Sequence, residues 1–287
     1  MIAEQSLTRR KALNIVMLSL TGVCTVLTAG VLLLILGYLF WNGARSLNWA
    51  FLTELPVPVG ELGGGMANAI VGSLKILAMA TLIGFPIGFL VGVYLSEFGT
   101  AWFPSVVRFV TDLLNGVPSI VMGVFAYGLI VLRMGGHFSA FAGAVALGIM
   151  MIPIAVRSTE EFLHAVPNSL REGAMALGAA KWKAIVTVVI PAASRGIITA
   201  VMLGLARVAG ETAPLLFTAS DNQWWSNGLN EPTATLPVRI FLYAISPYDD
   251  WHRQAWAAGF LLLLSILVIN ILARVVVSHG FAHSPKR

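Results

Sequence analysis

The sequence has few charged residues and a single cysteine. Asp, Glu, Lys and Arg make up 11% of the 287 residues, whereas soluble domains carry roughly a quarter. Cys24 is the only cysteine and lies in an apolar run, which excludes a disulfide framework, a CxxC redox pair and a thiolate metal site. Because 57% of the residues are hydrophobic, we expect a chain that lies in a lipid bilayer.

Motifs for nucleotide and metal chemistry are also missing. The sequence has no GxxxxGK[ST] loop to cradle ATP phosphates, no HExxH helix and no other histidine cluster at metal-ligand spacing. The glycines at 63–65 do not complete a GxGxxG pattern, since Asn68 stands where the last glycine is needed. We therefore expect no catalytic residue, no bound metal and no cofactor in this chain, and no room for a catalytic domain.

Six apolar segments are long enough to cross a bilayer, which takes about 20 residues of helix. They cover residues 15–40, 67–95, 109–132, 138–156, 192–217 and 255–277. The sequence therefore predicts an all-α integral membrane protein with about six transmembrane helices. One domain spans 15–277, with a cytoplasmic segment at 1–14 before it and a cytoplasmic tail at 278–287.

The basic residues predict the orientation of these spans. Arg9, Arg10 and Lys11 precede the first span, which places the N-terminus in the cytoplasm, and an even number of spans returns the C-terminus to that side. On this assignment Arg45, Arg133, Arg239 and Arg253 are the only basic residues on the outer side. The net charge of +5 is thus explained by topology, and nucleic acid is not expected as a partner.

The loop at 166–191, between the fourth and fifth spans, is charged and amphipathic where its surroundings are apolar. Ser169 and Glu172 have the spacing of a capping box, which predicts the start of a short helix. Gly178 is placed to end that helix in the left-handed conformation. We expect the loop to lie outside the bilayer.

Leu170, Ala174 and Leu177 share one face of this predicted helix at i, i+4 and i+7. Arg171, Lys181 and Lys183 add positive charge around that ridge. Two interpretations fit these residues equally well: the ridge docks in a groove of a partner protein, or the helix lies on anionic lipid.

The same loop resembles the EAA motif of ABC-importer permeases. The matching residues are Glu172, Gly173 and Ala174, then Gly178 six residues after the glutamate, then the Val188-Val189-Ile190-Pro191 run. Gly173 replaces the usual alanine, which should weaken the helix by about 0.5–1 kcal/mol. The resemblance implies the MetI-like (type I) permease architecture, with this loop as the coupling helix that docks on a separate ATPase.

Further segments resemble the phosphate permeases within that family, over nearly the whole chain. They lie at 51–58, 94–99, 118–127, 169–178, 207–218 (RVAGETAPLLFT) and 270–276. This resemblance implies an importer of inorganic phosphate with four kinds of subunit: this chain, a second related permease, two copies of an ATPase that binds ATP and Mg²⁺, and an extracytoplasmic phosphate-binding protein.

Arg207 lies 16 residues after Pro191, roughly 24 Å along a helix and therefore deep in the fifth span. A central arginine costs about 2.5–3.5 kcal/mol on insertion scales, so it should face a partner or a wet cavity. Glu211 follows four residues later on the same face. Either the two residues neutralise each other and join helices, or Arg207 faces the translocation path and meets the anion while Glu211 competes for it.

Gly210 and Pro214 favour a break in the helix beside this pair, because Pro214 has no amide hydrogen for the Gly210 carbonyl. Arg157 and Arg195, at the neighbouring ends of the fourth and fifth spans, are weaker candidates for the substrate path. Each is more readily expected as an anchor in the lipid headgroups.

Two other classes of function share parts of this pattern. An ion-coupled secondary transporter would have the same composition and spans, but it has no use for an ATPase-docking loop. A permease for another oxyanion, such as sulfate or molybdate, is the main alternative to a phosphate permease.

Overall fold

The protein is helical throughout the residues that the structure describes, and no strand occurs among them. The computed structural model describes residues 2–99 and 102–280, with side chains over 9–99 and 102–275. Its α-helices are α1 (Ile2–Ser46), α2 (Trp49–Thr53), α3 (Ala67–Glu97), α4 (Trp102–Gly116), α5 (Ser119–Ala126), α6 (Ala140–His164), α7 (Asn168–Ala176), α8 (Lys181–Ala184), α9 (Ile190–Ala209), α10 (Ala213–Thr218), α11 (Leu236–Ala244) and α12 (Asp249–Gly280). The predicted all-α fold is confirmed.

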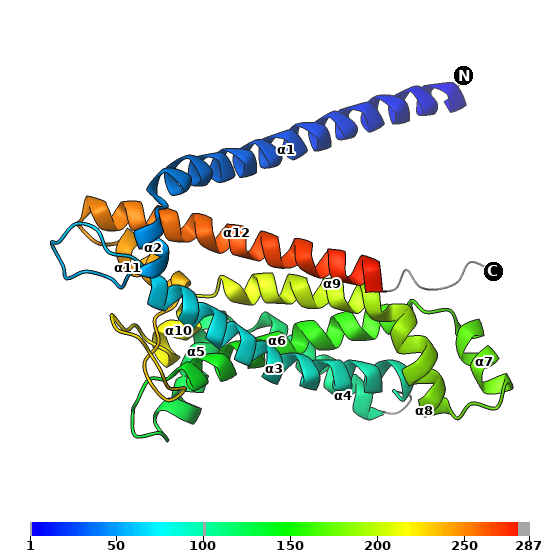
Figure 1. Ribbon diagram of the computed structural model, residues 1–287. Helices are drawn as coiled ribbons and strands as arrows, with labels where there is room; N and C mark the ends of the chain where they lie inside the picture. Colours follow the sequence, from blue (N-terminus) through cyan, green and yellow to red (C-terminus); the bar gives the residue numbers. More distant parts are fainter. Residues whose placement is uncertain (1, 100–101, 281–287) are drawn as a thin grey trace.

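Apart from α1, the long helices run roughly side by side in Figure 1. Five helical segments are long and apolar enough to cross a membrane, and a bent pair, α4 with α5 and the turn that follows it, makes up to six. The predicted spans at 15–40, 67–95 and 255–277 lie inside α1, α3 and α12. Helix α1 begins at Ile2, so the segment before the first predicted span is helical too.

The third predicted span, 109–132, is not one helix, and that prediction is wrong. Helix α4 ends at Gly116, α5 begins at Ser119, and the two are bent by 102°. Pro118 lies at the bend, and a proline disfavours the helical conformation in the residue before it. After α5 the chain continues as a π-helical segment, Tyr127–Val131.

The fourth span ends later than predicted. Helix α6 begins at Ala140, where Ser139 accepts a hydrogen bond from the Ala142 amide (3.1 Å), and it runs to His164. The apolar sequence stops at Val156, but the charged residues beyond it pair with α4. Arg108 Nε lies 2.6 Å from Glu160 Oε1, so this buried carboxylate is neutralised and the helix continues.

The fifth span differs from the prediction of 192–217 at both ends. The chain is helical from Lys181 through a π-helical segment, Ile185–Val189, and on to Ala209. Pro191 lies in the first turn of α9. Proline has no amide hydrogen to donate, and the π-helical segment before it accommodates the missing hydrogen bond. The expected break is present: α9 ends at Ala209 and α10 begins at Ala213.

Helices α3 and α6 cross closely because three glycines on α3 face α6. A Cβ atom on Gly84 would lie 2.4 Å from the Gly148 carbonyl oxygen, and one on Gly88 would lie 2.5 Å from Ala155 Cβ. Gly92 is equally tight against Thr159. The four-residue spacing of these glycines is a small-xxx-small pattern, which lets membrane helices approach at backbone distance.

Replacing Gly88 with valine should therefore destabilise the fold. The added side chain must push α3 away from α6, and overpacking of this kind costs about 1–3 kcal/mol or more. The matched control is Gly22→Val on α1, where a Cβ atom meets nothing within 4 Å. Thermal unfolding in detergent should show a lower Tm for Gly88→Val alone; equal Tm values would contradict the close crossing.

A partly buried lysine and a buried arginine organise the loop at 219–235, at the end of the bundle that carries α11. Lys75 donates to the Ser226 carbonyl oxygen (3.2 Å). Arg239 is 2% exposed and pairs with Asp221 (2.8 Å). It also donates to the Tyr243 hydroxyl (3.1 Å), and burial raises the pKa of that tyrosine, which keeps its hydroxyl protonated.

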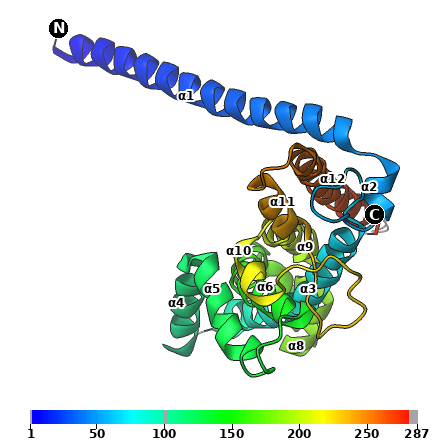
Figure 2. The same cartoon turned by 90° about the vertical axis from the view of Figure 1, so that its left-hand side faces the viewer.

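Helix α1 stands away from the rest of the molecule, as Figures 1 and 2 show. Its side chains from 9 to 38 are all exposed. It contacts α12 only near its C-terminal end, where Tyr38 packs edge-on against Trp256 and Phe40 against Phe260. Most of its apolar surface has no partner within the described part of this chain.

Candidate substrate path and coupling loop

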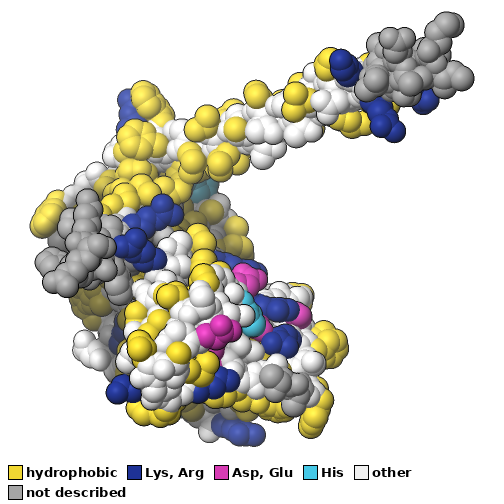
Figure 3. Space-filling view, turned by 90° about the vertical axis from the view of Figure 1, so that its right-hand side faces the viewer, with side chains coloured by type: hydrophobic (Ala, Val, Ile, Leu, Met, Phe, Trp, Pro, Cys, Tyr) yellow, Lys and Arg dark blue, Asp and Glu magenta, His cyan; other side chains and the backbone are white. Residues whose placement is uncertain are grey.

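Helix α7 lies at the end of the bundle opposite α11 (Figure 1), and we refer to this end as the α7 end. None of its residues is buried, as expected for a loop outside the bilayer. Figure 3 views the molecule from this side and shows Lys and Arg side chains spread over its surface.

The predicted capping box at Ser169 and Glu172 is wrong. The residue before the first turn is Pro167, and no side chain accepts a hydrogen bond there. Pro167 (φ −58°) places Ser169 inside the helix, where its hydroxyl cannot serve as an N-cap. At the other end the prediction is confirmed: Gly178 has φ +86°, and the amides of Gly178 and Ala179 bond back to Met175 and Ala174 in the pattern of a glycine C-cap.

Arg171 fixes α7 to the bundle. Its guanidinium lies 2.8 Å from Glu97 at the end of α3, and it donates to the carbonyl oxygens of Leu163 (2.7 Å) and Val166 (2.5 Å) after α6. Lys181 Nζ donates to the Glu97 carbonyl oxygen (2.6 Å). Arg171 and Lys181 therefore point back to the bundle and join four helices, instead of surrounding the ridge as the sequence suggested.

Glu97 is a residue that sequence reasoning missed. Its side chain is only 4% exposed, and an ionised carboxylate so buried requires a partner. The available signal was an acidic residue at the end of a long apolar span with several cations in a loop that follows. A count of charges does not reveal which of those cations pairs with it.

The apolar ridge of α7 remains uncovered. Leu177 is 91% exposed and Leu170 44% exposed, while Ala174 between them is partly exposed. Met175 adds a further exposed apolar side chain. Exposed apolar side chains grouped on a helix outside the apolar spans are typical of a surface that binds another protein.

Two glycines in this loop should respond oppositely to alanine. At Gly178 the left-handed backbone costs an alanine about 1–2 kcal/mol, so Gly178→Ala should loosen the end of α7. At Gly173 the backbone is helical and a Cβ atom meets nothing, so Gly173→Ala should stabilise the helix by about 0.5–1 kcal/mol.

Protease cleavage within the loop, followed over time in the purified protein, measures this difference. We expect faster cleavage for Gly178→Ala and slower cleavage for Gly173→Ala. Equal rates for the two variants would show that the backbone at Gly178 does not control the loop.

Arg207 lies in the last turn of α9, beside the helix break. Its side chain is exposed and lines a small cavity with Asn115 from α4, Met150 and Ile154 from α6. Within the described residues its guanidinium makes neither an ion pair nor a hydrogen bond. Glu211 lies in the break, one turn further along, and the direct Arg207–Glu211 contact that one interpretation required is not formed.

The structure does not bring the other two arginines to Arg207. The Arg157 guanidinium binds both carboxylate oxygens of Asp112 on α4. Arg195 lines a separate groove between α9 and α12 together with Arg274. The candidate path is therefore Arg207 with Asn115 and the break at 210–212, whereas Arg157 is already neutralised by a carboxylate.

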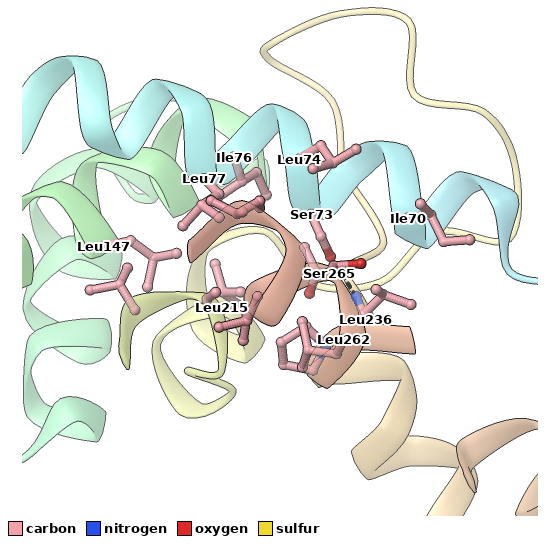
Figure 4. Close-up of a pocket in the computed structure, with 16 residues that line it drawn as sticks. Ile70, Ser73, Leu74, Ile76, Leu77, Leu147, Leu215, Leu236, Leu262 and Ser265 are labelled. Carbon is pink, nitrogen blue, oxygen red and sulfur yellow. Dashed lines mark hydrogen bonds between the residues drawn. The ribbon is translucent and has the colours of Figure 1, made fainter. Parts of the chain in front are cut away.

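A further cavity among α3, α6, α9, α10, α11 and α12 is apolar and does not suit an anion (Figure 4). Leucines and isoleucines form most of its wall, and no cationic residue lines it. The Ser73 hydroxyl points toward Leu236 and accepts a hydrogen bond from its amide (2.7 Å). This cavity belongs to helix packing.

Residues 84–279 match the family of binding-protein-dependent transport system inner membrane components. The match begins in α3 and includes α7, Arg207 and most of α12.

Several curated proteins are similar to this chain along most of its length. The phosphate transport system permease protein PstA of Yersinia pestis is 45% identical over 262 residues, 88% of each chain. PstA of Haemophilus influenzae is 44% identical, covering 94% of this chain and 95% of its own. PstA 1 of Mycobacterium tuberculosis (strain H37Rv) is 37% identical over 75% of this chain and 70% of its own.

Two solved transporters share the fold. The MetNI methionine ABC transporter, in an inward-facing conformation, matches with a TM-score of 0.63 at 21% identity, covering 75% of this chain and 96% of that one. A bacterial alginate ABC transporter, in complex with its alginate pentasaccharide-bound periplasmic protein, matches with a TM-score of 0.62 at 14% identity over 88% and 92%. The predicted MetI-like architecture is confirmed.

Proposed function

Since the chain belongs to the family of binding-protein-dependent transport system inner membrane components, we propose that it is the membrane-spanning permease subunit of an ATP-driven importer of inorganic phosphate. The observation that carries the substrate is the 44–45% identity to phosphate permeases over most of both chains. These identities favour phosphate over sulfate or molybdate as the substrate.

Arg207 is the residue that we assign to the anion. Its guanidinium contacts no carboxylate of the described residues, lies beside a helix break and borders a cavity with Asn115. A planar guanidinium donates to two phosphate oxygens at once and stays charged at every physiological pH. Non-helical backbone at membrane depth is tolerated only next to protein or water, which supports the proposal that the break at 210–212 borders an aqueous path.

Release of the anion requires that this contact be weak. Glu211 lies one turn from Arg207 without touching it, so a small movement of the break brings the carboxylate to the guanidinium. We propose that ATP-driven rearrangement of the helices makes this exchange and displaces the phosphate. Arg157, held by Asp112, then acts in packing α4 against α6 and not in binding the substrate.

The exposed ridge of α7 supports docking on an ATPase subunit. Leu170 and Leu177 present apolar surface outside the spans, and Arg171 transmits movement of α7 to α3 and α6 through Glu97 and two carbonyl oxygens. We propose two copies of that ATPase, which bind ATP and Mg²⁺, a second related permease beside this chain, and an extracytoplasmic phosphate-binding protein at the α11 end.

This arrangement supports one orientation in the bacterial inner membrane. The α7 end faces the cytoplasm, where ATP is available, and the loop at 219–235 faces outward. Both termini then lie in the cytoplasm, in agreement with the basic residues at 9–11.

Uptake of labelled phosphate by cells with and without this chain tests the proposal. In a strain with no other active phosphate importer, the chain should confer uptake that stops when ATP is depleted. Unlabelled arsenate should compete and unlabelled sulfate or molybdate should not. Competition by sulfate or molybdate, with unchanged phosphate flux, would assign the permease to another oxyanion.

A further inference from the structure

A groove between α9 and α12 carries two arginines that the substrate path does not use. Arg195 from α9 and Arg274 from α12 line it, together with Thr199, Asn270 and the apolar side chains Ile198, Met202, Leu203 and Ala273. Its volume is about 390 Å³. It lies toward the α7 end, since Arg195 is near the start of α9 and Arg274 near the end of α12.

No acidic side chain among the described residues balances the charges in this groove. No Asp or Glu lines it, and within the described residues neither Arg195 nor Arg274 forms an ion pair. The polar side chains between them are partly engaged: Asn270 donates to the Ile266 carbonyl oxygen (2.8 Å), and Thr199 donates to that of Arg195 (2.8 Å). Two neighbouring guanidiniums of like sign are stabilised when an anion binds between them.

The groove is also amphipathic along its length. From Arg195 to Leu203 the wall runs roughly 12 Å along α9, from charged to apolar. The neighbouring face of α12 is exposed and apolar, with Leu267, Ile271 and Leu272 each at least half exposed. An anion with a hydrocarbon tail matches such a wall at both ends, whereas a free phosphate ion matches only the charged end.

We propose that this groove binds an acidic phospholipid, with the headgroup phosphate between Arg195 and Arg274 and an acyl chain along Met202 and Leu203. Basic pockets between membrane helices on the cytoplasmic side are suited to anionic headgroups. The apolar wall selects the lipid over free phosphate, which shares the same oxyanion chemistry.

Lipid retention by the intact membrane complex, purified through a tag on this chain, tests the site. The complex is placed in nanodiscs of phosphatidylcholine with a titrated fraction of phosphatidylglycerol, and bound lipid is counted by mass spectrometry after delipidation. Loss of two arginines from the surface, in Arg195→Gln/Arg274→Gln, should weaken phosphatidylglycerol binding about 30-fold. Phosphatidylcholine binding should not change.

Two controls separate charge from folding and position. Arg9→Gln/Arg10→Gln removes two exposed charges from the same side of the molecule and should leave phosphatidylglycerol binding as it is. Arg195→Lys/Arg274→Lys keeps both charges and should retain most of the binding. Equal retention by the wild type and the glutamine double variant would overturn the proposal.

Two further outcomes would assign the groove to something else. If labelled inorganic phosphate binds with the same dependence on both arginines and displaces the lipid, the groove is an exit site for the substrate. If the intact complex holds no lipid there and the double variant loses a subunit, the groove is a protein interface. Neither outcome bears on whether the transporter carries phosphate, which the uptake assay decides separately.

Discussion

Replacing Arg207 with glutamine should reduce phosphate uptake by at least about tenfold, because a hydrogen bond to a charged group contributes about 1.5–3 kcal/mol. Glutamine keeps a polar side chain, although a shorter one, and removes the charge and the paired donors. Since Arg207 has no ion pair in the described part of the chain, the substitution leaves no unpaired carboxylate behind. Uptake of labelled phosphate, normalised to the amount of complex in the membrane, measures the effect.

The design of this test separates binding from folding. Arg207→Lys keeps the charge without the two-pronged geometry and should retain part of the flux. Arg133→Gln, an exposed arginine between α5 and α6, is the matched control and should transport normally. Normal flux through Arg207→Gln, at normal abundance of the complex, would show that the anion passes without this guanidinium.

Replacing Arg171 with alanine should uncouple the ATPase from the permease. The Glu97 carboxylate would remain buried without its cation, and breaking a buried pair costs about 3–5 kcal/mol. Helix α7 would also lose its bonds to the carbonyl oxygens of Leu163 and Val166. We expect uptake near background, with little ATPase retained on the complex during purification.

The controls for Arg171 lie in the same region. Lys183→Ala removes an exposed charge that makes no side-chain contact within the described residues, and it should leave ATPase retention unchanged. Glu97→Gln combined with Arg171→Gln removes both charges together and should recover more ATPase than Arg171→Ala alone. A normal amount of ATPase on the Arg171→Ala complex would contradict the role of this arginine.

The sequence predicts the apolar spans well and their ends poorly. Hydropathy locates α1, α3 and α12 because lipid-facing and packed residues are both apolar. It fails at α6, where the helix runs eight residues past Val156 because Arg157 and Glu160 are neutralised by α4. It fails at Pro118 for another reason: the mean hydropathy stays high across the 102° bend and does not reveal it.

The site was predictable in its residues but not in its contacts. Local sequence identified Gly178 and the helix break at Gly210 and Pro214, since both depend on backbone chemistry within a few residues. The pairs Arg171–Glu97 and Arg157–Asp112 join residues 74 and 45 positions apart. Spacing along one helix cannot reveal such pairs. The same kind of spacing predicted a capping box at Ser169, but Pro167 occupies the N-cap position instead.

The separation of α1 from the remaining helices has a consequence for biosynthesis. This helix is translated before the other described helices, and no described residue that follows covers residues 9–38. Its insertion is therefore energetically complete before the other spans exist. The glycines of α3, in contrast, pack against α6, so this part of the bundle can form only after α6 has emerged, as a step separate from anchoring.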